Sequence, residues 1–393
     1  MYQVLFAMMA SQASVALAAF TLPVIAPVAA ESFGVPPTYV GYYTTLMLVG
    51  ATLATAITAG FVRRYGALRV SQMTLVFATF GVVALPLSVT SSLTIGFLTA
   101  SALLAGFAYG PANPASSHLL VKVTPNYLRG RVFSIKQTSV PIGGAVAGFA
   151  LPWVTLQIGW QMAAMTVAGL CILLVMILQP LRQQMDADRV PGSPLLGARM
   201  VTTLQLVMRH PSLRRLAAAS GAFAAMQFCF MSVFVAFAVE RTGFSLVAVG
   251  TALSSGLVVS VFSRMGWGWA ADRFPARYVL AALGLSMSIS AFLAAMLGAT
   301  WPYAALVALA IAFGSTGTAW QGVYLAEVAR TAPEGQVADA TSGCMAITFF
   351  GALAGPGMFS ALDALTGNDA AGFVLVGAIT FAFGSAFLFK ERR

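Results

Sequence analysis

Charged residues are scarce in this sequence: only 8% of its 393 residues are Asp, Glu, Lys or Arg, against about 25% in an ordinary soluble domain. This shortage excludes an ordinary soluble fold. Histidine is nearly absent too, with His118 and His210 as the two examples, and the acids do not cluster. The sequence therefore offers no catalytic constellation and no P-loop for ATP. We expect no enzyme activity, no cofactor and no metal ion.

Cysteine is also scarce. The three cysteines, Cys171, Cys229 and Cys344, all fall within apolar runs. Their spacing fits neither a disulfide framework nor a metal site, so we interpret them as small core residues. Basic residues are missing from one whole stretch, because the first 62 residues contain no Lys or Arg. That stretch lacks the basic leader of a signal peptide and is too long for a signal core, which favours a membrane helix.

The sequence is rich in long runs of apolar residues. The mean hydropathy is +0.87, and the apolar residues gather in runs of roughly 20 or more, long enough to cross ~30 Å of hydrocarbon as helices. We therefore predict an all-α membrane protein. Its twelve transmembrane helices are expected at about 4–30, 39–62, 69–90, 93–121, 132–157, 160–182, 213–239, 244–271, 276–298, 301–329, 335–362 and 370–389.

The net charge of +10 would suit a nucleic-acid-binding protein, but its placement does not. Basic residues recur in every second connection between the apolar runs, whereas the opposite connections hold only Arg241. This positive-inside pattern predicts a multi-pass protein of a bacterial-type inner membrane, with both termini cytoplasmic and no nucleic-acid partner. The basic connections contain Arg63, Arg64 and Arg69; Lys122, Arg129 and Arg131; residues 182–215; Arg273 and Arg277; Arg330; and Lys390, Arg392 and Arg393.

The two halves of the sequence resemble each other. Gly106 and Pro125, for example, recur 208 positions later as Gly314 and Pro333. The longest polar stretch lies between the halves and contains an amphipathic segment at 199–209 that is typical of a helix on a membrane surface. We predict two pseudo-symmetric six-helix halves, 1–182 and 213–393, joined by a cytoplasmic linker, 183–212. Such repeats are typical of proteins whose halves rock about a central site.

Two loops between apolar runs carry related motifs. One reads Gly268-Trp-Ala-Ala-Asp272-Arg273-Phe-Pro275, and the other, in the first half, has Arg63 at the position of Asp272. With twelve helices, a central cytoplasmic loop and a two-fold repeat, the chain resembles a major facilitator superfamily transporter over essentially its whole length. The family pattern for this loop is Gly-x-x-x-Asp-Arg-x-Gly. The second half departs from it only at Pro275, whereas the first half keeps Gly66 but has Ala59 and Arg63 in place of the first Gly and the Asp.

The resemblance implies that these loops form a gate latch. Asp272 would cap the start of the eleventh helix, near residue 335, because a carboxylate is stabilised at the positive end of a helix. Arg273 would pair with Glu327. The first half lacks both acids, so we expect its part of the latch to be weakened; the alternative is that these residues only mark orientation. The expected gating set is Gly268, Asp272, Arg273, Glu327, Arg63, Arg64 and Gly66.

Arg264 is a candidate binding residue because a cation inside a membrane segment is costly unless it faces protein or water. It lies eight residues before Asp272, about 12 Å deeper along the helix. The segment around it resembles the eighth helix of monocarboxylate and oxalate carriers of the superfamily. In those carriers an Arg at this place binds a carboxylate, which its planar fork suits. The alternative is that Arg264 extends to the membrane surface.

Lys136 is a second candidate, about five residues into the fifth helix and beside Gln137. Together with Arg264, which lies in the other half, it would hold an anion across the pseudo-two-fold axis. Snorkelling to water is the alternative for this lysine as well. We further expect polar side chains at mid-membrane depth to line the central cavity, although each amide would serve equally well in a hydrogen bond between helices. These side chains are Gln12, Asn113, Gln227, Gln321 and Tyr324.

The sequence predicts a secondary active transporter that moves a small organic anion, with a carboxylate as the leading substrate class, by alternating access. His118 and Glu31 are candidate proton sites, and proton symport is favoured over anion exchange. The expected partners are the anionic substrate and the lipid bilayer, and the expected state is a monomer. Efflux of amphipathic drugs is the main alternative, and a receptor on the same fold is another.

Overall fold

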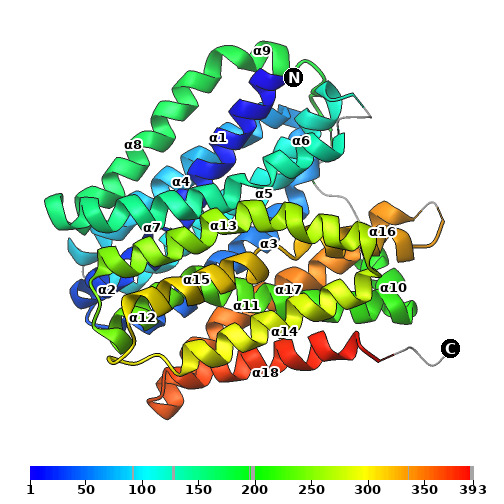
Figure 1. Cartoon of the computed structure of the whole chain (residues 1–393). Coiled ribbons are helices and arrows are strands. Elements are labelled where there is room, and N and C mark those ends of the chain that lie inside the picture. The colour runs from blue at the N-terminus through cyan, green and yellow to red at the C-terminus, as the bar shows by residue number, and fades with distance from the viewer. Residues whose placement is uncertain (91–92, 126–128, 194, 196–199, 335, 390–393) are drawn as a thin grey trace. The chain divides into compact units, whose positions relative to one another are not determined.

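The computed structural model describes residues 1–393 except 91–92, 126–128, 194, 196–199, 335 and 390–393, and the described part is all-helical (Figure 1). Twenty helical elements are described. They are α1 Tyr2–Ala19, α2 Thr21–Phe33, η1 Pro37–Tyr39, α3 Val40–Tyr65, α4 Ala67–Thr90, α5 Thr94–Val123, α6 Arg129–Lys136, α7 Ser139–Ile158, α8 Trp160–Leu178, η3 Gln179–Leu181, α9 Arg182–Met185, α10 Met200–Arg209, α11 Pro211–Ser232, α12 Phe234–Thr242, α13 Leu246–Arg273, α14 Ala276–Ala295, α15 Tyr303–Gly317, α16 Gln321–Thr331, α17 Val337–Thr366 and α18 Ala370–Ala386.

The membrane spans follow from length and hydropathy. Within the described residues, ten helical segments are long and apolar enough to cross a membrane, and the bent pair α11 and α12 supplies an eleventh. The remaining apolar helix, α18, has 17 residues. These segments correspond one by one to the twelve predicted apolar runs. The amphipathic segment of the linker is helical as well, at α10.

Several spans are broken, and proline explains two of the breaks. A proline has no N–H, and its ring clashes with the carbonyl four residues earlier. Pro23 therefore interrupts the first span near Ala19, where α1 ends and α2 begins. Pro141 acts in the same way on Gln137, so the fifth span consists of α6 and α7 rather than one continuous helix. The second break leaves Lys136 as the last residue of α6.

The chain divides into two compact units. Unit 1 comprises Met1–Pro36 and Leu46–Gly197, and unit 2 comprises Pro37–Thr45 and Ala198–Arg393. The short segment 37–45 belongs to unit 2 because it packs against α17: the Ser360 hydroxyl donates to the Thr38 carbonyl at 2.6 Å, and the Thr45 hydroxyl donates to the Leu353 carbonyl at 2.9 Å.

The packing inside each unit repeats as the sequence does. In unit 1, α1 crosses α7 where Gly143 faces Ala13, and in unit 2, α11 crosses α17 where Gly351 faces Gly221. Each residue of the second pair lies 208 positions after its counterpart in the first. A Cβ on either Gly143 or Gly351 would collide with the backbone carbonyl opposite. Small residues therefore set the close approach of these helices, as is usual within a membrane.

Candidate functional site

Lys136 is fully buried at the end of α6. Its ammonium donates to both oxygens of Asn113, the side-chain Oδ1 and the backbone carbonyl (3.3 Å), and lies 3.4 Å from the Ser117 hydroxyl. These partners are neutral, and the ion pairs recorded among the described residues do not include Lys136. A buried cation without a carboxylate partner is costly, because the ammonium has lost its water without gaining an opposite charge.

The Asn113 side chain, by contrast, is exposed on α5. Because its Oδ1 accepts from Lys136, the amide is held in one orientation and its NH₂ group is directed away from the lysine. The pair therefore presents a hydrogen-bond donor to an incoming group, with a positive charge directly behind it. The neighbouring helix α7 begins at Ser139 and adds the positive end of a helix dipole to the same region.

Two further predicted residues lie in unit 1. Gln12 is buried on α1, and its Oε1 has no hydrogen-bond partner among the described residues. Gln137 is half-buried in the break between α6 and α7. An unsatisfied buried acceptor such as the Gln12 carbonyl would be stabilised by any group that donates a hydrogen bond to it.

The equivalent place in unit 2 contains hydroxyl groups instead of a cation. Cys344 stands 208 positions after Lys136, and Ser220 stands 208 positions after Gln12. The Ser220 and Thr348 hydroxyls are 2.6 Å apart, and the buried Tyr324 side chain faces them and the Cys344 thiol. The Tyr324 hydroxyl itself makes no hydrogen bond of normal geometry with a described residue. The two units are therefore similar in fold but differ in the charge of this region.

Gln227 takes part in a bond between helices. Its Oε1 accepts from the Trp320 indole N–H at 3.0 Å, and both side chains are buried in unit 2. This geometry favours the structural role for Gln227 over ligand contact. The pairing with Trp320 was not predicted from the sequence. Gln321, the first residue of α16, is half-buried.

Arg264 lies within α13 and is half-buried. One turn further along the helix, the Trp267 indole donates to the Ser315 carbonyl at 2.8 Å, which ties α13 to α15. Gly268 has open space around it, so a Cβ at this position would meet no atom of the described structure. This glycine is therefore not required for close packing within unit 2.

The predicted contact between Arg273 and Glu327 is not the one that forms. Glu327 pairs with Arg330, three residues away on α16, with 2.8 Å between Nε and Oε2. Arg273 is exposed and lies over the Trp269 ring, with 3.8 Å between the guanidinium carbon and the ring centroid. Both contacts are with a residue about one turn away on the same helix. Such a partner costs less side-chain entropy to reach than one on another helix.

A cavity of about 1120 Å³ lies at this end of unit 2, and its walls include Asp272, Glu327 and Arg330. Asp272 itself is exposed at the end of α13. The expected cap by Asp272 near residue 335 lies outside the described residues. The cavity brings acidic and basic residues from several helices of unit 2 to one place, which is the place where the resemblance locates a gate.

In unit 1, a residue from the linker binds the corresponding loop, between α3 and α4. Asp186 is buried, and its carboxylate accepts from the backbone N–H groups of Leu68 (2.8 Å) and Arg69 (3.0 Å) at the start of α4. Gly66, which precedes α4, has φ +95, and a Cβ there would collide with Asp186. Burial raises the pKa of the Asp186 carboxyl, although the two N–H donors and Arg182 act in the opposite direction.

The loop itself lacks the acid, as its sequence shows, but the linker places a carboxylate beside it that was not expected. The linker also binds α3 and α5. The Val190 N–H donates to the Arg63 carbonyl at 2.7 Å. Asp188 contacts His118 Nε2 at 2.9 Å and Lys122 at 3.1 Å.

The two predicted proton sites occupy helix ends. His118 is exposed near the end of α5, where its partner is Asp188, an arrangement that favours a structural role for this histidine. Glu31 is exposed at the end of α2. Arg63 is exposed, whereas Arg64 is half-buried with its guanidinium carbon 5.6 Å from the centroid of the Tyr65 ring.

Comparison with known proteins adds two findings. The family model of the Major Facilitator Superfamily matches residues 5–356. Among solved structures, a POT family transporter in complex with 5-aminolevulinic acid aligns with a TM-score of 0.78 at 13% identity, covering 98% of this chain and 95% of that chain.

Two further solved structures are similar to this chain. A peptide transporter POT in complex with sulfate aligns with a TM-score of 0.73 at 14% identity, covering 98% and 94% of the two chains. The nucleoside transporter NupG aligns with a TM-score of 0.78 at 14% identity, covering 98% and 100%. No curated protein matches the sequence. At these identities the solved structures show a shared fold.

Proposed function

This chain belongs to the major facilitator superfamily of membrane transporters, and from that premise we propose that its substrate is a small organic anion, bound in unit 1 at Lys136 and Asn113. The protein is a multi-pass membrane transporter and not an enzyme. The carboxylate class of substrate, the coupling to protons and the roles of individual residues are parts of the proposal.

The observation that carries the proposal is the buried ammonium of Lys136 with its neutral partners. An anion that reaches the Asn113 amide would restore neutrality close to this charge. Two opposite unit charges about 6 Å apart, with the amide between them, gain about 3 kcal/mol at an effective dielectric constant of 20. A neutral substrate would gain nothing comparable, and a cationic substrate would be repelled.

Arg264 is proposed as the carboxylate-binding residue of unit 2. It is a half-buried cation on a membrane-spanning helix, and its position resembles that of the substrate-binding arginine in monocarboxylate carriers. Gln321 and Tyr324 are proposed to assist Arg264 within unit 2, and Gln137 is proposed to assist Lys136 within unit 1. Gln227 is left out of this set because Trp320 already binds its carbonyl.

Two of the similar structures contain ligands with an anionic group, and in 5-aminolevulinic acid an amino group accompanies it. One contains 5-aminolevulinic acid, which has a carboxylate, and another contains sulfate. We propose proton symport as the coupling mode because a carboxylate substrate can itself carry the proton. A protonated carboxyl group could then donate to the unpartnered Gln12 carbonyl. The gate is proposed to involve Asp272 in unit 2.

Gate residues of unit 1 and the topology complete the proposal. In unit 1 the gate is proposed to involve the loop of Arg63 and Arg64, closed by the linker through Asp186. A cytoplasmic location of both termini, a bacterial-type inner membrane and a monomeric state are proposed from the charge pattern and the absence of any need for a partner chain in the site.

The test is uptake of radiolabelled small carboxylates into proteoliposomes, with and without an imposed pH gradient. Lys136→Gln removes the charge and keeps a hydrogen-bond donor. Asn113→Asp places a carboxylate against the ammonium and so satisfies the lysine internally. We expect both variants to lose saturable uptake by about tenfold or more, since roughly 1.4 kcal/mol of binding energy corresponds to a factor of ten.

Cys344→Ser is the matched control, because it changes the repeat-equivalent position in unit 2 without altering charge. It should keep uptake near the wild-type level, and a melting curve should show that each variant is folded. Arg264→Ala tests the second unit in the same assay. Full carboxylate uptake by folded Lys136→Gln would refute the anion site. If the folded wild-type protein takes up no carboxylate, the proposed substrate class is wrong.

A further inference from the structure

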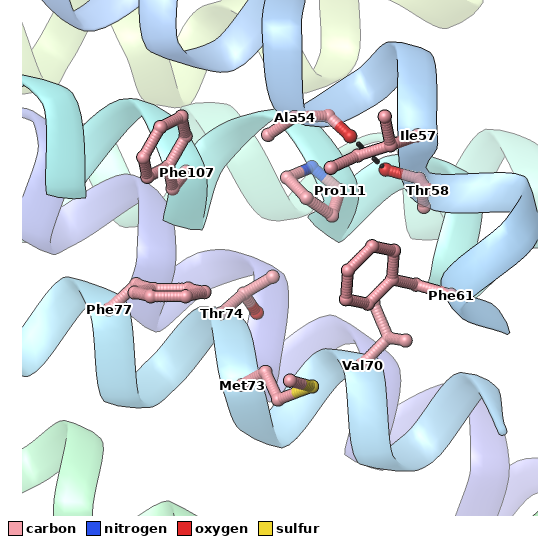
Figure 2. A pocket seen from close by; sticks show the side chains of 10 residues that line it. All are labelled: Ala54, Ile57, Thr58, Phe61, Val70, Met73, Thr74, Phe77, Phe107 and Pro111. Carbon is pink, nitrogen blue, oxygen red and sulfur yellow. Dashed lines mark hydrogen bonds between the residues drawn. The ribbon is translucent and has the colours of Figure 1, made fainter. Parts of the chain in front are cut away.

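Unit 1 contains an apolar cavity that the proposed transport site does not use. It has a volume of about 210 Å³ and lies between α3, α4 and α5 (Figure 2). Figure 2 shows the Phe61 ring directed from α3 toward Val70 on α4, while Phe77 and Phe107 lie at the other end of the cavity. All three walls belong to membrane-spanning helices.

The lining of the cavity offers no free hydrogen-bond donor to a ligand. Its two hydroxyl groups are already used, because Thr58 donates to the Ala54 carbonyl at 2.7 Å and Thr74 donates to the Ser71 carbonyl at 2.7 Å. The remaining lining side chains are aliphatic, aromatic or Met. An occupant would therefore be held by apolar contact alone, and hydrocarbon is the matching chemistry.

Two arginines, one on α3 and one on α4, lie near one end of the cavity. On α3, Arg64 comes three residues after Phe61 and so lies one turn further along the same face. The contacts agree, because the Phe61 and Tyr65 ring centroids are 5.6 Å apart and the Arg64 guanidinium lies over Tyr65. On α4, Arg69 directly precedes the cavity residue Val70, and its guanidinium lies 3.4 Å from the Gln72 side-chain oxygen. The backbone of the α3–α4 connection thus places both arginines within about one helical turn of residues at one end of the cavity.

We propose that this place is a binding site for an anionic phospholipid, with a segment of one acyl chain in the cavity and the headgroup phosphate near Arg64 and Arg69. Charge and apolar shape match the two parts of such a molecule, and clusters of Lys or Arg at helix ends attract anionic headgroups. The same α5 helix holds Asn113 two residues after Pro111, which lines the cavity. A bound lipid would therefore contact the helix that positions the Lys136 partner.

The test is native mass spectrometry of the full chain, purified in detergent and titrated with dioleoylphosphatidylglycerol or with the zwitterionic dioleoylphosphatidylethanolamine. The double variant R64Q/R69Q removes the headgroup partners, and Met73→Trp narrows the cavity without changing charge. R273Q/R277Q is the matched control, because it removes two arginines from the equivalent loop of unit 2.

We expect one phosphatidylglycerol to be retained by wild type and by R273Q/R277Q, at least tenfold more tightly than phosphatidylethanolamine. Retention should fall by at least tenfold in R64Q/R69Q and in Met73→Trp. Melting curves establish that each variant is folded. Equal retention of both lipids would show that the site does not select an anionic headgroup. Wild-type retention by folded Met73→Trp would show that the acyl chain does not bind in the cavity. Lipid retention is measured without carboxylate uptake, so a failure of the lipid proposal can be distinguished from a failure of the proposed transport function.

Discussion

Replacing Asp186 with Ala should destabilise unit 1, because this residue caps a helix that has no cap of its own. The position before α4 is Gly66, which has no side chain to accept the first N–H groups of the helix. Asp186, which is 118 residues away from Leu68, accepts from Leu68 and Arg69 in its place. Removal of this carboxylate leaves both N–H groups without their acceptor.

The expected magnitude follows from these contacts. Loss of a helix cap costs about 1 kcal/mol in general and up to about 2. A charge at a helix N-terminus adds ~0.3–1 kcal/mol. Because Asp186 is buried and water cannot easily replace it, we expect a loss of about 2 kcal/mol. For a cooperative unit of this size, that corresponds to a decrease in melting temperature of roughly 4–8 °C.

The assay is thermal melting followed by intrinsic fluorescence in detergent, combined with hydrogen exchange of the Leu68 and Arg69 amides. Asp186→Asn keeps one acceptor oxygen, so it should show about half the effect. Asp188→Ala is the matched linker control. Its side chain is 35% exposed, so its ion pairs should contribute below about 1 kcal/mol. A melting temperature of Asp186→Ala equal to that of wild type, with unchanged exchange at both amides, would refute the reasoning.

Two further predictions concern packing and pH. Gly143→Val should lower stability by about 1–3 kcal/mol in a melting experiment, because its side chain would collide with the Ala13 carbonyl; an unchanged melting temperature would contradict this. Partial burial raises the pKa of the Asp188 carboxyl, but hydrogen bonds from His118 and Lys122 outweigh it and hold that pKa below its usual value. The contribution of these two hydrogen bonds to the free energy of unfolding is therefore present above about pH 4 and lost below it. Wild type and Asp188→Asn should converge in melting temperature at acid pH.

The helices could be predicted from the sequence because hydrocarbon permits few alternatives. Each apolar run must satisfy its own backbone hydrogen bonds, so a run of sufficient length forms a spanning helix. The break after Lys136 could also have been predicted from Pro141, although the fifth span was expected to be continuous. The family was identified correctly from the loop motif and the repeat.

The partners of polar side chains could not be predicted in the same way. Arg273 and Glu327 were expected to pair with each other, and each has a local partner instead. For Gln227 the sequence left cavity lining and a bond between helices equally open, and its carbonyl accepts from Trp320. In each case several partners lie within reach of a flexible side chain, and helix rotation and depth decide which one is used.

The all-helical membrane fold and the similarity of the two halves could be predicted from the sequence, because both depend on local apolar length and on residue identity at a fixed offset. The burial of Lys136 against Asn113 and the cap that Asp186 of the linker provides for α4 become visible only in the folded chain. These contacts join separate elements of unit 1. Their geometry depends on how the helices pack, which no local pattern in the sequence records.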